Sequence, residues 1–498
     1  MSDDNASARE LIRQAARGAG IGAVVAGLSR LLFFVQQLIL ARLLMAEAFG
    51  EFAFASLVVG LPALLANLRG AEAIVQSDLD EPGVRRLGDT AFTAQLIAAA
   101  LIAGAMIAGR HGIAGVLGKT YLAPLLVGMS VLVFTAVGGP SSNSGPLMLP
   151  AAWLERRLDF IRARLPELIN VVVNILVSVV LALAGAGVWS LAGGLIAGSL
   201  AQAGMLWGLA GFRPRLRLER QVLGTFLRFG WPLYLSYLLS WGYLNADYYF
   251  VGRWLGEFEL GLYYMAFNLS QVPLQVRFII GRVAFPTFSR ARNDPAFLSR
   301  LYAQATRYAM ALGGCVCAVG IGLAEPAVRL LLGARWAPAA PALQILLLST
   351  LIRTGLGFNG DLLVSLGKTG TVLAATAAAL GTLLALGPWM MMRWGIIGMA
   401  WAVCASSLTT ALISSLVIRR HLTVHYLREL GPALACLAVV AGLGMWIAGT
   451  LGGIACLVGA GLGLMAVYLG LYIGIFDRPL AGRLASWVRR RNGRIVTR

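Results

Sequence analysis

The chain has 498 residues, of which 58% are hydrophobic and only 13% are charged, and its mean hydropathy is +0.77. This composition excludes a soluble protein, which could not carry it without exposing large apolar patches. The formal net charge of +19 comes mostly from arginines that lie in short segments between apolar runs. That arrangement is typical of a multi-pass membrane protein and does not indicate a nucleic-acid partner.

Apolar runs close to the length needed to cross a bilayer recur along the whole chain. Charges, Gly/Pro clusters and loop signals divide them into fourteen candidate spans, with approximate bounds 18–42, 48–68, 88–108, 120–140, 165–184, 188–211, 225–245, 254–276, 305–323, 340–364, 369–391, 395–417, 430–449 and 452–474. No segment between them is long enough to fold as a separate domain. We therefore predict an all-α integral membrane protein of about 14 transmembrane helices, whose work is done between the helices.

The distribution of cations predicts the orientation. With the N-terminus in the cytoplasm, 32 Lys and Arg side chains lie on the cytoplasmic side and seven on the other. This asymmetry predicts an even number of spans with both termini cytoplasmic. The basic tail from Arg478 onward is either a membrane anchor or a disordered end. The segment from Trp153 to Leu165 alternates apolar and basic residues at helical spacing, which predicts an interfacial helix on anionic lipid or a solvated basic loop.

An internal repeat organises these spans. Residues 36–76 align without a gap to residues 247–287 at an offset of 211, and the alignment matches Arg42 with Arg253, Leu44 with Leu255, Gly50 with Gly261, Ala55 with Ala266, Pro62 with Pro273, Gly70 with Gly281 and Ala73 with Ala284. The copies are displaced by an even number of spans, so they cross the membrane in the same direction. We expect two parallel-duplicated six-helix lobes, residues 1–217 and 218–425, followed by two extra helices and a basic tail at 426–498.

Charged side chains inside spans cost about 2.5 to 3.5 kcal/mol and mark transport pathways by default. Arg30 lies about 18 Å into the first span, where it either faces a cavity or caps broken backbone carbonyls. Gln36 and Gln37 follow on the same helix. The repeat aligns Gln36 with Asp247, which is either a pathway carboxylate or an ion-pair partner of Arg253.

Span ten carries Arg353 and Asp361 about two helical turns apart, so both side chains share one face. Three glycines around them allow close approach or a local helix break. The pair could bind an anion and respond to its charge, or it could pair with neighbouring side chains. A polar stripe on one face of span eight predicts a cavity lining or a helix-packing surface: Asn268, Gln271, Gln275 and Arg277.

Catalytic and metal-binding patterns are missing from the sequence. His421 and His425 have a spacing that suits a metal, but they lie in a basic loop without nearby carboxylates or thiols, so a solvated loop is the expected structure. The five cysteines lie inside apolar stretches and are expected to pack. There is no P-loop. We predict that the protein is not an enzyme and has no cofactor or metal.

Several segments resemble polysaccharide (O-antigen type) flippases of the Wzx/PST group in the multidrug/oligosaccharidyl-lipid/polysaccharide exporter (MOP) superfamily. They cover spans one to ten and comprise residues 40–50 (LARLLMAEAFG), 158–160 (LDF), 245–256 (NADYYFVGRWLG), 260–264 (LGLYY), 283–289 (VAFPTFS) and 331–336 (LLGARW). The pattern is most similar to the branch of lipopolysaccharide and exopolysaccharide biosynthesis proteins. It is specific to the family and not to any one glycan.

The resemblance implies alternating access to a central cation-lined cavity in a bacterial inner membrane. The substrate would be an undecaprenyl-pyrophosphate-linked oligosaccharide, bound by Arg30, Arg353 and either Arg277 or Arg282. Asp247 or Asp361 would couple transport to an H⁺ or Na⁺ gradient. Implied partners are the polysaccharide polymerase and chain-length proteins.

Two other function classes stay open. A cation-coupled drug exporter of the same fold would have a less basic cavity with a central carboxylate. A membrane-embedded polymerase or ligase would need a large outer loop with catalytic residues, which this chain lacks.

Overall fold

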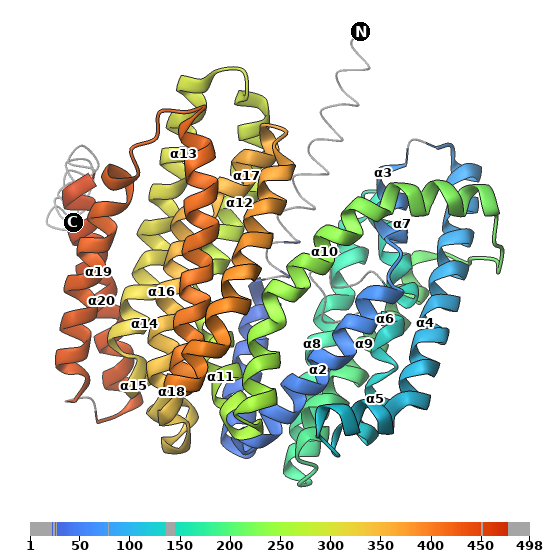
Figure 1. The fold of residues 1–498 in the computed structure, drawn as a ribbon, viewed down its shortest axis with the longest axis horizontal. Helices are drawn as coiled ribbons and strands as arrows, with labels where there is room; N and C mark the ends of the chain where they lie inside the picture. Colours follow the sequence, from blue (N-terminus) through green and yellow to red (C-terminus); the bar gives the residue numbers. More distant parts are fainter. Residues whose placement is uncertain are drawn as a thin grey trace, which may run out of the picture. The chain divides into compact units, whose positions relative to one another are not determined.

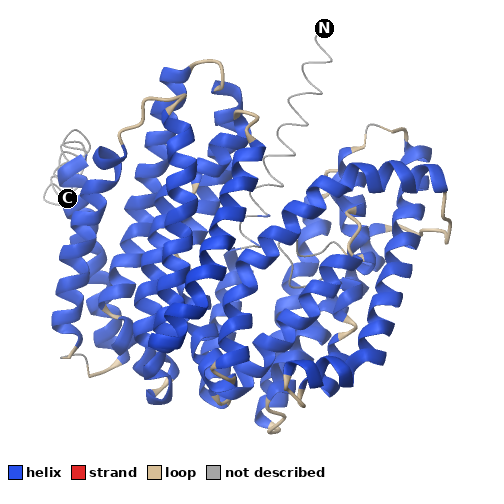
Figure 2. Ribbon diagram, in the orientation of Figure 1, coloured by secondary structure: helices blue, strands red, loops and turns tan. Residues whose placement is uncertain are grey.

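The computed structural model describes residues 22, 25, 27–77, 79–135, 145–449 and 452–476. Every regular element in these ranges is helical (Figure 2). The chain forms two compact units, Met1–Gly261 and Leu262–Arg498, and each is described by itself. The basic tail from Arg478 lies outside the described residues.

The first unit begins with a helix over residues 27–43. It continues with α2 (Ala46–Ala66), α3 (Gly70–Gln76), α4 (Glu81–Leu117), α5 (Leu122–Met129), α6 (Leu132–Thr135), η1 (Pro146–Met148), α7 (Leu149–Arg156), α8 (Phe160–Leu183), α9 (Val188–Ala210) and α10 (Arg220–Trp254) (Figure 1). Helix α11 (Glu257–Ser270) starts in the first unit and ends in the second.

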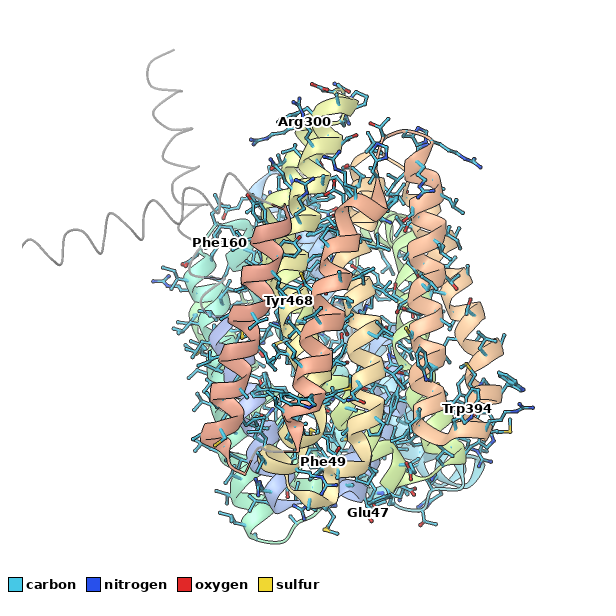
Figure 3. The ribbon with its side chains drawn as sticks, turned by 90° about the vertical axis from the view of Figure 1, so that its left-hand side faces the viewer. Glu47, Phe49, Phe160, Arg300, Trp394 and Tyr468 are labelled. Atoms are coloured by element: carbon cyan, nitrogen blue, oxygen red, sulfur yellow. The ribbon has the colours of Figure 1, made fainter. Side chains whose placement is uncertain are left out.

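The second unit continues with α12 (Leu274–Ala291), α13 (Pro295–Ala309), η2 (Met310–Gly314), α14 (Cys315–Gly322), α15 (Ala324–Ala327), η3 (Val328–Leu332), η4 (Ala334–Ala339), α16 (Ala340–Leu356), α17 (Phe358–Ser365), α18 (Thr369–Arg419), α19 (Tyr426–Ala448) and α20 (Ile454–Phe476). Helix α18 is two helices joined at a corner, because Trp394 and Gly395 have non-helical backbone angles. Arg300 and Trp394 lie toward opposite ends of this unit (Figure 3).

The helices account for the predicted number of spans. Nine helices in the described ranges are long and apolar enough to cross a membrane, and the corner in α18 divides one of them into two. Four more segments complete the set: residues 27–43, α5 with α6, α10, and α11 with α12. They miss the length or hydropathy criterion because they are short, interrupted or carry charges. The prediction of an all-α membrane protein of about fourteen spans is confirmed.

Local sequence signals fix the helix ends. Asp80 begins α4, where its carboxylate accepts a hydrogen bond from the Gly83 N–H at 3.0 Å and Pro82 occupies the first turn. Asp294 caps α13 in the same way through the Phe297 N–H at 2.9 Å. At the other end of α4, Gly118 adopts a left-handed conformation with φ of 68°.

The interfacial helix predicted over Trp153–Leu165 is not formed. Helix α7 ends at Arg156 and α8 starts at Phe160, so the segment consists of the end of α7, a turn at residues 157–159 and the start of α8. Trp153 is only 4% exposed and packs in the core of the first unit beside Phe212. The regularly spaced arginines that suggest a lipid-facing surface either bind other groups of the protein or point outward. They surround the buried indole ring of Trp153.

The two copies of the repeat meet through their aligned glycines. A Cβ atom on Gly50 would lie 1.8 Å from the carbonyl oxygen of Glu257, and one on Gly261 would lie 1.8 Å from that of Ala46. Glu257 is the repeat partner of Ala46, as Gly261 is of Gly50, so each contact is the mirror of the other under the offset of 211. The first turns of α2 and α11 therefore cross at a local two-fold axis. The two helices can approach this closely only because both crossing positions are glycine. The lobe boundaries at residues 217 and 425 stay a prediction.

We expect Gly50→Ala and Gly261→Ala each to lower the stability of the protein, by about 1 to 3 kcal/mol, because the added methyl overlaps a backbone carbonyl. The measurement is thermal unfolding of the purified protein in detergent. Gly204→Ala is the matched control, since nothing lies within 4 Å of a Cβ at that helical position. Equal melting temperatures for all three variants would contradict a tight crossing.

Candidate functional site

A membrane-spanning helix of the first unit is interrupted between α2 and α3. Arg69, the residue before α3, has φ of 65° and ψ of 32°, a left-handed conformation that is uncommon for a residue other than glycine. Its N–H donates to the side-chain oxygen of Asn67 at 3.0 Å, and Gln95 of α4 donates to the same oxygen at 3.3 Å. The backbone N–H of Arg69 at the break is therefore met by the Asn67 side chain, as an apolar surrounding requires, and Gln95 binds that same side chain.

The Arg69 guanidinium is enclosed, with only 3% of the residue exposed. Nη1 forms an ion pair with Glu72 at 2.9 Å, and the guanidinium carbon lies 3.4 Å from the centre of the Tyr237 ring on α10. A buried cation is stabilised only by such a combination of opposite charge, hydrogen bonds and an aromatic face. The break, its cation and α10 thus form one connected cluster.

Arg156 closes the far end of α3. Its guanidinium donates to the backbone carbonyls of Ile74, Ser77 and Leu79 at 3.1, 2.6 and 3.0 Å. The Ile74 carbonyl lies in the last turn of α3 and the other two follow its end, where carbonyls have no partner within the helix. Helix α3 is therefore held by an arginine at each end.

The second unit contains two interruptions that face each other. Between α11 and α12 the helix breaks at residues 271–273, and between α16 and α17 it breaks at Gly357. Arg277 of α12 bridges to the second break, where Nη2 donates to the Gly357 carbonyl at 2.8 Å and to the Asp361 carboxylate at 3.0 Å. The side chains of Arg277 and Asp361 are 16% and 30% exposed, so this ion pair is only partly enclosed.

Glycine is required at position 357 for this contact. A Cβ there would lie 2.2 Å from the backbone carbonyl oxygen of Arg353 and 2.3 Å from Arg277 Nε, which is closer than atoms can approach. Arg353, one turn before the break, lies 3.4 Å from the side-chain oxygen of Gln271 in the first break, a weak contact. The helix break predicted from the glycines of span ten is therefore present, and it connects to the polar stripe of span eight.

A neutral network holds the other side of α17. The Tyr302 hydroxyl donates to the Asn359 side-chain oxygen at 2.5 Å, and the Asn359 amide donates to Ser414 and Ser415 at 3.1 and 2.8 Å. Asn359 is 1% exposed. It fixes the first turn of α17, on which Asp361 lies two residues further along.

The structure brings together three of the predicted site residues and spreads out the others. Arg277, Asp361 and Arg353 gather around the breaks of the second unit. The remaining candidates lie elsewhere. Arg30 and Arg282 are exposed, and Gln37 is half-buried. The Asn268 side chain donates to the Tyr264 carbonyl of its own helix, and Asp247 is 2% exposed and accepts a hydrogen bond from the Tyr248 N–H.

Gln36 lies within a packing network of the first unit. Its amide donates to Asn174 and Ser178 of α8 at 2.9 and 3.1 Å, and Gln36 is 5% exposed. Helix α9 approaches this network through Gly194, where a Cβ would lie 1.9 Å from the Ser178 hydroxyl. In this structure Gln36 therefore stabilises the contact between helices.

The cluster around Arg69 is not predicted from the sequence, in which Arg69 counts among the cations outside the spans. The available signal is the sequence Asn67-Leu68-Arg69-Gly70 directly after an apolar run, since Asn and Gly favour turns. Nothing in the sequence indicates that Tyr237, far along the chain, covers the guanidinium.

These features define a class of protein. Discontinuous membrane helices that carry charged side chains at their breaks are the mark of transporters. Residues 39–341 match the polysaccharide biosynthesis protein family, and the chain belongs to this family. The membership of a polysaccharide biosynthesis family that the sequence motifs predict is confirmed.

Among its relatives is the succinoglycan biosynthesis transport protein ExoT of Rhizobium meliloti (strain 1021), 29% identical over 64% of this chain and 63% of that protein. The lipopolysaccharide biosynthesis protein WzxC of Escherichia coli (strain K12) is 25% identical over 66% of each chain. The matches thus span less than two thirds of the length of these relatives.

The fold is similar to that of two membrane proteins of known structure. The lipid II flippase MurJ in an inward closed conformation superimposes with a TM-score of 0.73 at 14% identity, over 92% of this chain and 100% of MurJ. An inward-facing multidrug resistance MATE family transporter of the MOP superfamily has a TM-score of 0.60 at 16% identity, over 78% of this chain and 95% of the transporter. Identities this low establish the fold and not the substrate.

We expect Gly357→Ala to impair function because the added methyl displaces Arg277 from the break. Gly360→Ala is the matched control, three residues further on, where nothing lies within 4 Å of a Cβ. The measurement is restoration of surface polysaccharide in a strain that lacks the gene, at equal protein levels. We predict at least a tenfold loss for Gly357→Ala and no change for Gly360→Ala; equal activities would dissociate the break from function.

Proposed function

We propose that the protein is a flippase that moves undecaprenyl-pyrophosphate-linked oligosaccharides across the bacterial inner membrane by alternating access, with both termini in the cytoplasm. The observation that supports this most is the Arg277–Asp361 pair at a helix break, because it places a partly enclosed cation inside a membrane-spanning unit. Membership of the polysaccharide biosynthesis family supports a substrate that belongs to polysaccharide synthesis. ExoT, a relative, is described as a transport protein for succinoglycan biosynthesis.

The chemistry of the pair suits a pyrophosphate. Arg277 presents a fork of donors that matches phosphate oxygens as well as carboxylate oxygens. An incoming pyrophosphate would compete with Asp361 for the guanidinium, and Arg353 lies at the neighbouring break to add a second cation. Arg30 and Arg282, both exposed, would meet the anion or acidic sugars earlier in its path.

Displacement of Asp361 supplies a route to coupling. A carboxylate that loses its arginine in an apolar surrounding favours uptake of a proton or another cation. Return of the pair after substrate release would expel that cation. A gradient of H⁺ or Na⁺ adds about 2.3 kcal/mol per charge per 100 mV of membrane potential, enough to bias the cycle. Asp247, buried on α10, is the second candidate for this role.

The released oligosaccharide would pass to a polysaccharide polymerase and its chain-length partner outside. The competing function, export of hydrophobic cations, takes its support from the likeness to the MATE transporter fold. A paired arginine in the candidate site favours an anionic substrate over a cationic one.

Deletion of the gene is expected to cause lipid-linked oligosaccharide to accumulate in the cytoplasmic leaflet while surface polysaccharide is lost. Radiolabelled lipid extracts and surface-polysaccharide gels measure the two quantities. Normal polysaccharide together with altered drug sensitivity would instead support the exporter. Normal lipid-linked intermediates with unpolymerised repeat units at the surface would support a polymerase.

Removal of charge at the proposed anion site should separate binding from coupling. We expect Arg277→Gln and Arg30→Ala to reduce export at least tenfold at unchanged protein level, since each removes a cation from the path of the pyrophosphate. Asp361→Asn should still flip substrate in vesicles but lose its dependence on an imposed ion gradient. Arg292→Gln, at an exposed position beyond α12, is the control. Wild-type export by Arg277→Gln would remove this site from the proposal.

A further inference from the structure

The segment that joins α9 to α10, residues 212–219, forms a strap across the beginning of α4 (Figure 1). Phe212 anchors one end of the strap. It is 5% exposed, and the centroid of its ring lies 5.4 Å from the centroid of the Trp153 ring. The backbone N–H groups of Arg215 and Arg217 donate to Asp89 and Thr93 of α4 at 2.9 and 3.0 Å. Because alternate N–H groups point to the same helix, this stretch of the strap is extended.

Arginines and leucines alternate along the strap. Arg213, Arg215 and Arg217 are exposed, while Leu216 and Leu218 between and beyond them are 74% and 47% exposed. In an extended chain, successive side chains point to opposite faces. The strap therefore presents cations on one face and bare leucines on the other.

Neighbouring carboxylates leave most of this charge uncompensated. Asp89 accepts from the backbone of the strap, and Glu219 pairs with Arg217 at 3.3 Å at an exposed position. In the part of the chain that the structure describes, the guanidinium groups of Arg213 and Arg215 make no ion pair. Arg85 and Arg157 lie close by, at 5.9 and 5.1 Å from the Trp153 ring, and Glu81 neutralises Arg157.

The strap lies at the level where a bilayer ends. It begins directly after the membrane-spanning helix α9. It crosses α4 at Asp89 and Thr93, in the third and fourth turns of a helix of 37 residues that is about 55 Å long and extends beyond the hydrocarbon core. At that level an exposed leucine can enter the acyl boundary while its arginine neighbours meet the phosphates. A water-filled loop or a free-phosphate site would not account for the leucines.

We infer that the strap is a binding site for the phosphate headgroups of anionic phospholipids in the leaflet that faces the cytoplasm in the proposed orientation. The arginines contact the phosphates and the leucines insert between the acyl chains. The inference goes beyond transport and takes only the orientation from the proposed function. Since the strap joins α9 to α10, bound lipid would fix this connection at the membrane surface.

The test is lipid binding by the full-length protein in detergent, followed by its melting temperature during titration with dioleoylphosphatidylglycerol. We expect the anionic lipid to raise the melting temperature, and dioleoylphosphatidylcholine or inorganic phosphate to have no effect. R213Q/R215Q should lower the apparent affinity roughly 25-fold, about fivefold for each cation lost at the surface. L216S/L218S should weaken it as well, and R213K/R215K should retain it.

The control is R292Q/R300Q, which removes the same charge from exposed positions on the second unit and should leave the affinity unchanged. The exposed strap variants should melt at the wild-type temperature without lipid, so lost binding is not lost folding. Unchanged affinity in R213Q/R215Q overturns the inference. So does full competition by inorganic phosphate, which identifies a free-anion site, or preference for undecaprenyl pyrophosphate over phosphatidylglycerol, which identifies a substrate site. None of these readouts depends on transport, so they stand or fall apart from the proposed function.

Discussion

A backbone carbonyl or N–H released from its helix inside hydrocarbon has no water to bind, and this constraint shapes the helix interruptions at Arg69 and Gly357. Asn67 and Gln95 serve the break before Arg69, and Arg277 serves the carbonyl of Gly357. The same rule explains the π-helical stretch Met310–Gly314, where the Tyr468 hydroxyl donates to the Met310 carbonyl at 3.0 Å. This contact holds α20 against η2. Next to it, Arg307 forms a bidentate ion pair with Glu429.

The two units use the same device to different ends. In the first, Arg69 is closed in by Glu72 and Tyr237 and acts as an internal brace. In the second, Arg277 donates to a single carboxylate oxygen of Asp361, and both side chains are partly exposed. A brace must keep its partners, whereas a binding group must be able to exchange them. The two aligned segments break their helices at non-equivalent positions, before Arg69 in one and at residues 271–273 in the other, and they carry different charged groups at those breaks.

The lengths of the apolar runs predict the spans, and the glycines near Arg353 and Asp361 indicate a close approach or a break there. Run length and glycine position are both local properties of the chain. The pairing of Asp361 with Arg277 is not local, and neither is the cover of Arg69 by Tyr237. Each depends on which helices become neighbours. Trp153 shows the limit most clearly: a basic amphipathic spacing is the same for a lipid surface and for a buried indole between arginines, and only tertiary contact distinguishes them.

The crossing of Gly50 with Glu257 and Gly261 with Ala46 also sets an order in time. The start of α2 enters the membrane long before α11 has been synthesised, since the two are 211 residues apart. At about 5 to 20 residues per second, translation leaves α2 without this neighbour for roughly ten to forty seconds. A helix with a glycine facing lipid during that interval is open to incorrect partners. The membrane insertion machinery would therefore have to protect the start of α2 from other partners until α11 has been inserted.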